Sequence, residues 1–342
     1  MVSGIEQERV GRWIAEHAPD ATPPFRYRLI AGGRSNLTYD VDDAAGRRLV
    51  LRRPPLGEVL QSAHDMGREH RILSALHPTA VPVPRPLGFC DDPAVTGAPF
   101  YLMEHVDGLV LRDAADVPPA FGEPERRRTG EMIVDVLADL AALDPDAVGL
   151  GDLGRREGYV ERQLRRWHRQ FEQSRTRDIP SVDEVHRRLA SHVPPQRRTA
   201  IVHGDYRIEN TIVAPDGTVR AVLDWELCTL GDPLADLGWL IAYWIEPGED
   251  APHMNRRMPT VLPGFPDRAA VVARYVERTG ADVSSLRFYV ALALWKLACI
   301  AEGVYARYRA GVMADDGSDT DRLGDLVLAL GDEALAVSSD LG

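Results

Sequence analysis

The feature that most limits how this chain can fold is a change of pattern at Gly108. Before it, short segments alternate apolar and polar residues between glycine and proline turns, as strands do. After it, apolar residues recur at intervals of three and four over long stretches, as in amphipathic helices. Because strands come first and helices follow, the sequence predicts an α+β protein with a small antiparallel sheet and a larger, mostly helical part.

The first part should contain one helix before the sheet and one packed on it. Ser3 and Glu6 have the spacing of a capping box at the start of an N-terminal helix. Residues 62–76 carry apolar residues at helical intervals and are stopped by Pro78. Strands are expected in "RYRLIAGGRSNLTYDVD", "RRLVLRR", "VPVPRPLGFC" and "PFYLMEHVDG".

The second part should consist of long helices interrupted by two acidic loops. At 342 residues the chain exceeds the usual size of a single core, and we predict two lobes, residues 1–105 and 106–342. The helices are expected at residues 125–143, 160–171, 233–244, 268–279, 285–309 and 320–337.

Composition excludes several classes of protein. A net charge of -12 argues against a nucleic-acid partner, which needs a basic face. Three distant cysteines in apolar surroundings indicate a reducing compartment. The N-terminus is too polar for a signal peptide, and the longest apolar stretch, around residues 234–245, is too short to span a membrane. We therefore expect a cytoplasmic protein without a membrane partner.

Lysine is nearly absent, since Lys296 is the only lysine among 40 basic residues. A phosphate-binding loop of the form G-x-x-x-x-G-K-[ST] is therefore excluded, and any nucleotide chemistry must use arginine. Lys296 lies in the apolar segment "ALWKLACIAEGVY" with no cofactor motif beside it. We interpret it as a paired or snorkelling lysine rather than a Schiff-base lysine.

Two polar clusters follow short apolar runs, "HGDYRIEN" at residues 203–210 and "LDWE" at residues 223–226. Asp205 and Asn210 are five residues apart, and Asp224 follows Asp205 by nineteen. Phosphoryl transfer needs groups that orient a hydroxyl and hold metal on the phosphates, and carboxylates and carboxamides do both. Asp232 and Asp236 in "GDPLAD" are instead interpreted as structural residues at a helix start.

The two clusters resemble the catalytic and metal-binding loops of the aminoglycoside phosphotransferase and choline kinase group, which has a bilobal protein kinase-like fold. The segments "GGRSNLTY", "LRRPP", "SAHDMGREHRIL" and "WKLACIAEGVYARY" are most similar to the subgroup associated with acyl-CoA dehydrogenases. The resemblance implies ATP and Mg²⁺ as cofactors. It implies Asp205 as catalytic base or hydroxyl orienter, Arg207 as a cation near the γ-phosphate, and Asn210 and Asp224 as metal ligands, with His203 bracing the loop.

The resemblance also implies a nucleotide site in the first lobe. "AGGRSNLTY" corresponds to the phosphate-covering hairpin, "LVLR" to the strand that usually ends in lysine, and "YLMEHVDG" to the hinge. The implied nucleotide-binding residues are Gly33, Ser35, Asn36, Arg52, Glu69, Glu104 and Val106.

This nucleotide site departs from the family pattern at two places. The full G-x-G-x-x-G is missing, and Arg52 stands where the family has lysine. Strand alternation places Arg52 and Arg53 on opposite faces. The resemblance to the kinase strand V-A-I-K implies that Arg52 is on the cleft face, and we expect Arg53 to be solvated. Arg52 could pair with Glu69 through its bidentate fork. Glu69 could equally be a surface charge on an amphipathic helix.

The sequence thus predicts an ATP-dependent phosphotransferase that acts on a hydroxyl of a small molecule. The subgroup points to a hydroxylated acyl metabolite rather than an antibiotic, although the residues do not identify the acceptor. The alternative is a non-catalytic kinase-like module that binds a nucleotide or metabolite, which the missing lysine motivates. Neither the preference for ATP over GTP nor the oligomeric state is readable from the sequence.

Overall fold

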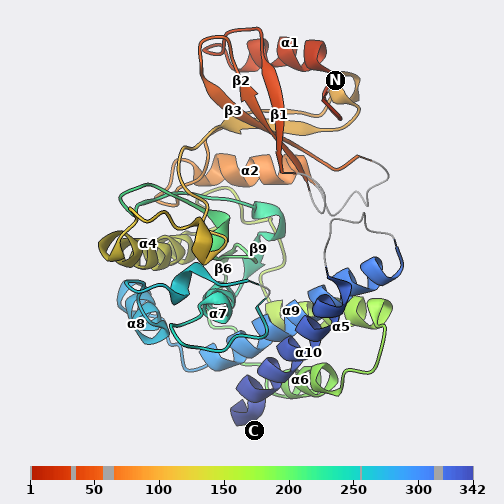
Figure 1. The fold of residues 1–342 in the computed structure, drawn as a ribbon, viewed down its shortest axis with the longest axis vertical. Helices are drawn as coiled ribbons and strands as arrows, with labels where there is room; N and C mark the ends of the chain where they lie inside the picture. The colour runs from red at the N-terminus through yellow and green to blue at the C-terminus, as the bar shows by residue number, and fades with distance from the viewer. Residues whose placement is uncertain (1, 32–35, 57–64, 255, 312–318, 342) are drawn as a thin grey trace. The chain divides into compact units, whose positions relative to one another are not determined.

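The chain separates into two compact units in a computed structural model that describes residues 2–31, 36–56, 65–254, 256–311 and 319–341 (Figure 1). The first, here the sheet unit, comprises residues 1–109 and 219–227. The second, here the helical unit, comprises residues 110–218 and 228–342. The segment that contains Asp224 therefore belongs with the N-terminal sheet, although it follows half of the helical unit in the sequence.

The sheet unit is built on a five-stranded antiparallel sheet of order β1-β2-β3-β5-β4. Helices α1 and α2 lie on opposite faces of this sheet (Figure 1). Its strands are β1 (Arg26–Ala31), β2 (Leu37–Asp42), β3 (Arg48–Arg53), β4 (Pro86–Cys90) and β5 (Phe100–Glu104). Its other elements are α1 (Gln7–His17), α2 (Met66–Leu76), α3 (Pro93–Thr96), β8 (Val219–Val222) and the 3-10 turn η3 (Trp225–Leu227).

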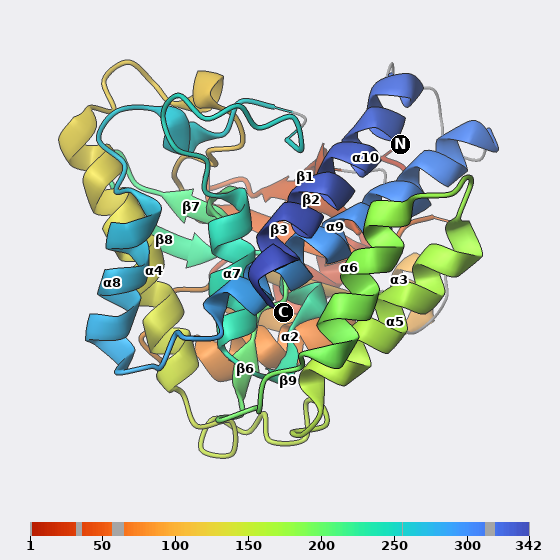
Figure 2. The same ribbon diagram turned by 90° about the horizontal axis from the view of Figure 1, so that it is seen from below.

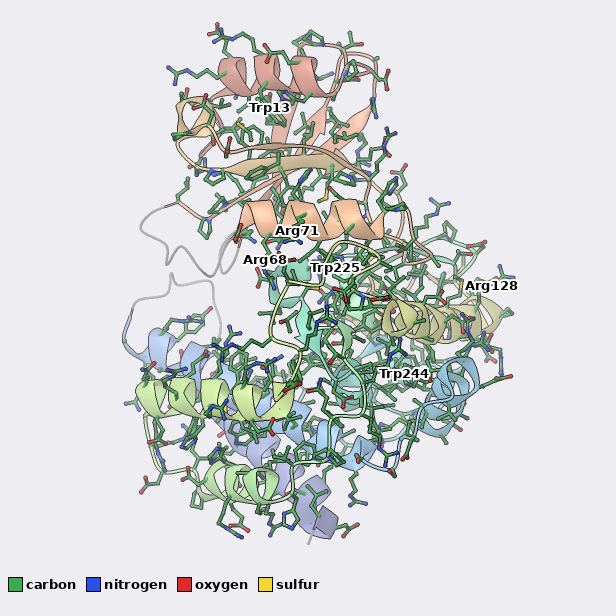
Figure 3. All side chains as sticks on the ribbon, turned by 180° about the vertical axis from the view of Figure 1, so that it is seen from behind. Trp13, Arg68, Arg71, Arg128, Trp225 and Trp244 are labelled. Atoms are coloured by element: carbon green, nitrogen blue, oxygen red, sulfur yellow. The ribbon has the colours of Figure 1, made fainter. Side chains whose placement is uncertain are left out.

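The core between α1 and the sheet follows the predicted alternation of β3. Leu49 and Leu51 are fully buried there, and Trp13 of α1 packs edge-on against Phe100 at 4.8 Å between ring centroids (Figure 3). Burying a large apolar side chain contributes about 1.5–3 kcal/mol. The α1 face is therefore a main source of stability for this unit.

Two local predictions in the sheet unit are wrong. Helix α1 begins after Glu6, and no side chain caps it, so the Ser3–Glu6 capping box does not form. Arg53 is buried rather than solvated, because carbonyl oxygens take up its guanidinium. It donates to Gly4, to Pro54 at 3.3 Å and to Thr96 at 3.3 Å.

The helical unit contains the long helices expected from the sequence, and one more. The unpredicted helix, α6 (Pro180–Ser191), has proline in its first turn and only a few buried residues, so its apolar pattern is short. The other helices are α4 (Glu123–Ala142), α5 (Tyr159–Ser174), α7 (Leu234–Tyr243), α8 (Arg268–Thr279), α9 (Leu286–Arg309) and α10 (Thr320–Val337). The remaining elements are η1 (Ala114–Asp116), β6 (Ala200–Val202), η2 (Ile208–Asn210), β7 (Thr211–Val213), β9 (Thr229–Gly231), η4 (Pro259–Val261) and η5 (Ser338–Leu341).

Helix α9 is the centre of the helical unit. It packs against α5, α6, α7 and α10, and Figure 2 shows α5, α6 and α10 gathered around it. Its length and a mean hydropathy of 1.4 would suffice to cross a membrane. Among the described residues, the long apolar helix is therefore α9, whereas the longest apolar stretch expected from the sequence was around residues 234–245. Because 67% of that apolar window is buried inside the protein, α9 is a core helix. The predicted α+β architecture, a small sheet unit and a larger helical unit, is confirmed.

Candidate active site

The loop between β6 and β7 contains the predicted catalytic residues, and α7 holds it in place. Asp236 of α7 is buried, and its two carboxylate oxygens accept from the backbone nitrogens of His203 at 2.6 Å and Gly204 at 2.8 Å. Gly204 has a φ of +84°, which glycine adopts without strain. Burial raises the pKa of the Asp236 carboxyl, against the opposing effects of His203 and these two bonds. Asp236 was predicted as a structural residue at a helix start. In the structure its two hydrogen bonds hold this loop in its turn.

Two hydrogen bonds and one ion pair from the helical unit hold the Asp205 carboxylate. Its Oδ1 accepts from Trp239 Nε1 at 2.7 Å and lies 3.0 Å from Arg207 Nε, and its Oδ2 accepts from Asn210 Nδ2 at 2.8 Å. Of its side-chain surface, 16% stays exposed. The carboxylate is therefore fixed in direction while one side remains open to a reacting group.

Asn210 and His203 also take part in this arrangement. Asn210 Nδ2 donates to both the backbone oxygen and the carboxylate of Asp205, so Oδ1 is the amide atom left to bind a metal. His203 is fully buried and its Nδ1 accepts from the backbone nitrogen of Asp205 at 3.2 Å. The predicted bracing role of His203 is thus confirmed.

Arg207 lies between two carboxylates. Besides Asp205, its guanidinium pairs with the buried Glu209, and it stacks over the Tyr243 ring at 4.7 Å. Glu209 is shared with Arg256. Glu209 belongs to the predicted polar cluster but had no predicted role of its own. Arg256 and Tyr243 were not predicted, because only the folded chain brings residues 243 and 256 to this loop.

In the sheet unit, Arg52 joins Glu69 to Asp224. Its Nε lies 3.3 Å from Glu69 Oε2, and its Nη2 donates to Asp224 Oδ1 at 2.7 Å. Glu69 is 2% exposed, which excludes the surface-charge interpretation. The guanidinium thus lies as a permanent cation between two carboxylates.

The surroundings of Glu69 make this ion pair part of a network. Tyr101 donates to Glu69 Oε2 at 3.0 Å, and Asn36 Nδ2 donates to Glu69 Oε1 at 2.9 Å and to Glu226 Oε2 at 3.4 Å. Burial raises the pKa of Glu69 to about 7, although Arg52 opposes the shift. Burial acts to lower the pKa of Arg52, but Tyr101, Glu69 and Asp224 outweigh it and raise that pKa.

The loop of Asp224 has an unusual backbone. Asp224 has a φ of 64°, a left-handed conformation that few residues other than glycine adopt. Trp225 Nε1 anchors the loop by donating to Val222 O at 3.0 Å, and Figure 3 shows Trp225 beside α2 with Arg68 and Arg71. Such conformations occur where the surrounding structure holds a functional residue in place.

The other predicted nucleotide residues are only partly described. Gly33 and Ser35 lie outside the described residues. Glu104 ends β5, and its side chain pairs with Arg47 at 2.9 Å and Arg85 at 3.5 Å. Val106 is half-buried two residues later. The Glu104 side chain is therefore engaged in two ion pairs.

The donor chemistry of these residues fits magnesium. Within the described part of the chain, no group of three His, Cys, Asp or Glu side chains is arranged to hold a metal by itself. Magnesium in kinases needs no such group, because one or two protein oxygens and the nucleotide phosphates share its coordination. Asp224 offers a carboxylate and Asn210 an amide oxygen, which are suitable donors.

Comparison with known proteins agrees with this chemistry. Residues 26–289 match the model of the "Phosphotransferase enzyme family". Acyl-CoA dehydrogenase family member 11 of Gallus gallus is 35% identical over 321 residues, which cover 92% of this chain and 40% of the relative. The chain thus spans about two fifths of the length of this curated relative.

Solved structures share the fold. A protein of Ralstonia eutropha assigned to the aminoglycoside phosphotransferases is 31% identical, with a TM-score of 0.82 over 97% of this chain and 98% of the other. Amicoumacin kinase, solved with AMP-PNP and Ca²⁺, is 15% identical, with a TM-score of 0.59 over 97% and 95% of the two chains. The chain therefore belongs to the phosphotransferase enzyme family and has its kinase-like fold, and its relatives include the acyl-CoA dehydrogenase family member 11 proteins.

Proposed function

We propose that this protein transfers the γ-phosphoryl group of ATP, with the help of Mg²⁺, to a hydroxyl of a small molecule. The observation that carries the proposal is the Asp205 carboxylate, which two hydrogen bonds and an ion pair hold in one direction while part of it stays exposed. A carboxylate held this way can orient an acceptor hydroxyl and take its proton as the oxygen attacks phosphorus.

The cations of the site would serve the nucleotide. Bound Mg²⁺ would neutralise charge on the phosphates, and we assign its protein ligands to Asn210 and Asp224. Arg52, paired with Glu69, would bind phosphate oxygens through its Nη1 donors. Arg207 would balance charge beside Asp205. The AMP-PNP complex of amicoumacin kinase supports an adenine nucleotide as donor.

The acceptor we propose is a hydroxylated acyl metabolite rather than an antibiotic. The support is the similarity to proteins named as acyl-CoA dehydrogenase family members, of which the chain matches about two fifths. The match does not include the other three fifths of those relatives. Any cooperation of this chain with a dehydrogenase is therefore part of the proposal.

A kinase-like binding module without catalysis is the second candidate. The observation that favours it is the bond between Arg52 and Asp224, which occupies the proposed metal ligand with a permanent cation. A module that only binds a ligand has little use for an Asp205 carboxylate fixed by two hydrogen bonds and an ion pair, which is why phosphoryl transfer is the better proposal.

Calorimetric titration with ATP, with and without Mg²⁺, tests the metal-dependent nucleotide site that phosphoryl transfer requires. We expect binding that depends on Mg²⁺ in the wild type, and loss of that dependence in Asp224→Ala because the carboxylate ligand is gone. Asp216→Ala, which removes an exposed aspartate eight residues earlier, is the matched control and should bind like the wild type. Absence of nucleotide binding in the wild type would favour the non-catalytic module.

A further inference from the structure

Lys296 is a buried charge that the proposed reaction leaves unexplained. It lies on α9 and is 8% exposed. Its Nζ donates to Gly204 O at 2.9 Å, one residue before Asp205, and lies 4.0 Å from the centre of the Trp239 ring and 5.3 Å from that of Trp167. A buried charge is costly unless its contacts compensate for lost hydration, and here they are a carbonyl and two aromatic faces.

The cavity beside Lys296 excludes a direct role with substrate. Its volume is about 20 Å³, which is about the space of one water molecule. The lining residues that carry polar groups include Gln163, Asp236 and Tyr289. A metabolite does not fit there, so the amine must act through the protein.

Two contacts lead from Lys296 to the proposed catalytic base. The ammonium group holds the carbonyl of Gly204, and with it the peptide unit that precedes Asp205. It also lies over the indole whose Nε1 donates to Asp205 Oδ1 at 2.7 Å. A cation on the ring face draws electron density from the indole and makes its N–H a stronger donor.

We propose that Lys296 and Trp239 are positioning residues, which together set the direction and hydrogen bonding of the Asp205 carboxylate during phosphoryl transfer. The proposal rests on the function proposed above. It assigns the single lysine of the chain to the reaction without contact with either substrate.

The charge on Lys296 should change within an accessible pH range. Burial lowers its pKa to about 8, against the opposing effect of Asp205 and Asp236. The lowered value means that the charged form costs folding free energy below pH 8, and that this cost disappears as the pH rises towards the ordinary value of 10.5. The charged and titratable groups that face Lys296 are Asp205 and Arg207 from the loop, Asp236 from α7, Arg166 and Tyr159 from α5, and Tyr289 from α9.

The first test observes directly whether the charge on Lys296 affects the Trp239 indole N–H, and it needs no substrate. In protein labelled with ¹⁵N-tryptophan, the indole N–H signal that disappears in Trp239→Phe belongs to Trp239. We expect this signal to shift with a midpoint near pH 8 in the wild type and to show no such step in Lys296→Met. A wild-type signal that stays constant from pH 6.5 to 9.5 would overturn the proposal.

The second test measures ADP formation from Mg-ATP in the full chain, with water as acceptor. We expect Lys296→Met and Trp239→Phe each to lower kcat about tenfold, with the KM for ATP unchanged, and the double variant to lose less than the product of the two. Wild-type kcat should fall as the pH rises through 8, and this fall should be missing in Lys296→Met. A kcat of Lys296→Met within a factor of two of wild type contradicts the proposal.

Cys299→Ala is the matched control for a general disturbance of α9. Cys299 is fully buried on the same helix, where Asp183 of α6 is the neighbouring charge, and its loss should leave kcat unchanged. Because a buried charge is removed, Lys296→Met should keep its melting temperature at pH 7. If the wild type neither binds nor turns over ATP while the indole step remains, the proposed function fails and the coupling stands.

Discussion

Replacing Asp205 with asparagine is expected to lower kcat by about 10²–10⁴-fold, the contribution typical of a positioned general base. The amide is nearly the same size and can still accept from Trp239 Nε1, so the loop should keep its shape. It has no charge for Arg207 and cannot take the proton of the acceptor hydroxyl. Affinity for Mg-ATP should change little.

The measurement is ADP formation with water and then with a panel of hydroxylated acids as acceptors, beside calorimetric titration with Mg-ATP. Asp250→Asn, in an exposed loop of the same unit, is the control that should retain full turnover. Unchanged turnover in Asp205→Asn, with normal nucleotide binding, would reject Asp205 as the base.

Gly238→Ala should destabilise the helical unit, although alanine normally favours a helix over glycine by about 1 kcal/mol. A Cβ at Gly238 of α7 would lie 2.6 Å from the backbone carbon and 2.8 Å from the backbone oxygen of Tyr289 on α9. Backbone atoms of a packed helix cannot move aside cheaply. Overpacking of this kind costs about 1–3 kcal/mol, and we expect a lower urea midpoint.

Gly303→Ala supplies the opposite expectation in the same fold. An added Cβ there would meet Gln170 Nε2 at 3.6 Å and Ser174 Oγ at 3.7 Å, which are ordinary contacts to side chains. Its urea midpoint should therefore stay equal or rise. If both variants shifted in the same direction, the close approach of α7 to α9 would not be the cause.

The parts of the fold that the sequence predicted are those with strong local patterns. The observed bounds of α8 and α10, 268–279 and 320–337, are the predicted ones, because each helix follows a polar N-cap, Asp267 or Asp319, that accepts from its first turn. The fold class followed from the order of strands and helices. Both acidic loops were predicted from the sequence, because each directly follows a short apolar strand.

What sequence could not show is which distant residues complete the loops. Trp239 reaches Asp205 across 34 positions, and Lys296 reaches Gly204 across 92. Both lie in apolar helices, where tryptophan and an isolated lysine have the pattern of ordinary core and snorkelling residues. Arg53 was expected in solvent for a related reason. Strand alternation predicts the face on which a side chain lies, but not which carbonyl oxygens from elsewhere in the chain lie close enough to accept from it.

The scarcity of lysine has a practical consequence for chemical labelling. Arg52 offers no amine to an acylating reagent, because its guanidinium stays protonated. The remaining amine, Lys296, is enclosed by Trp167, Trp239 and the Gly204 carbonyl. Amine-reactive probes should therefore leave Lys296 of the folded protein unmodified, and mass spectrometry should find Lys296 acylated only after denaturation.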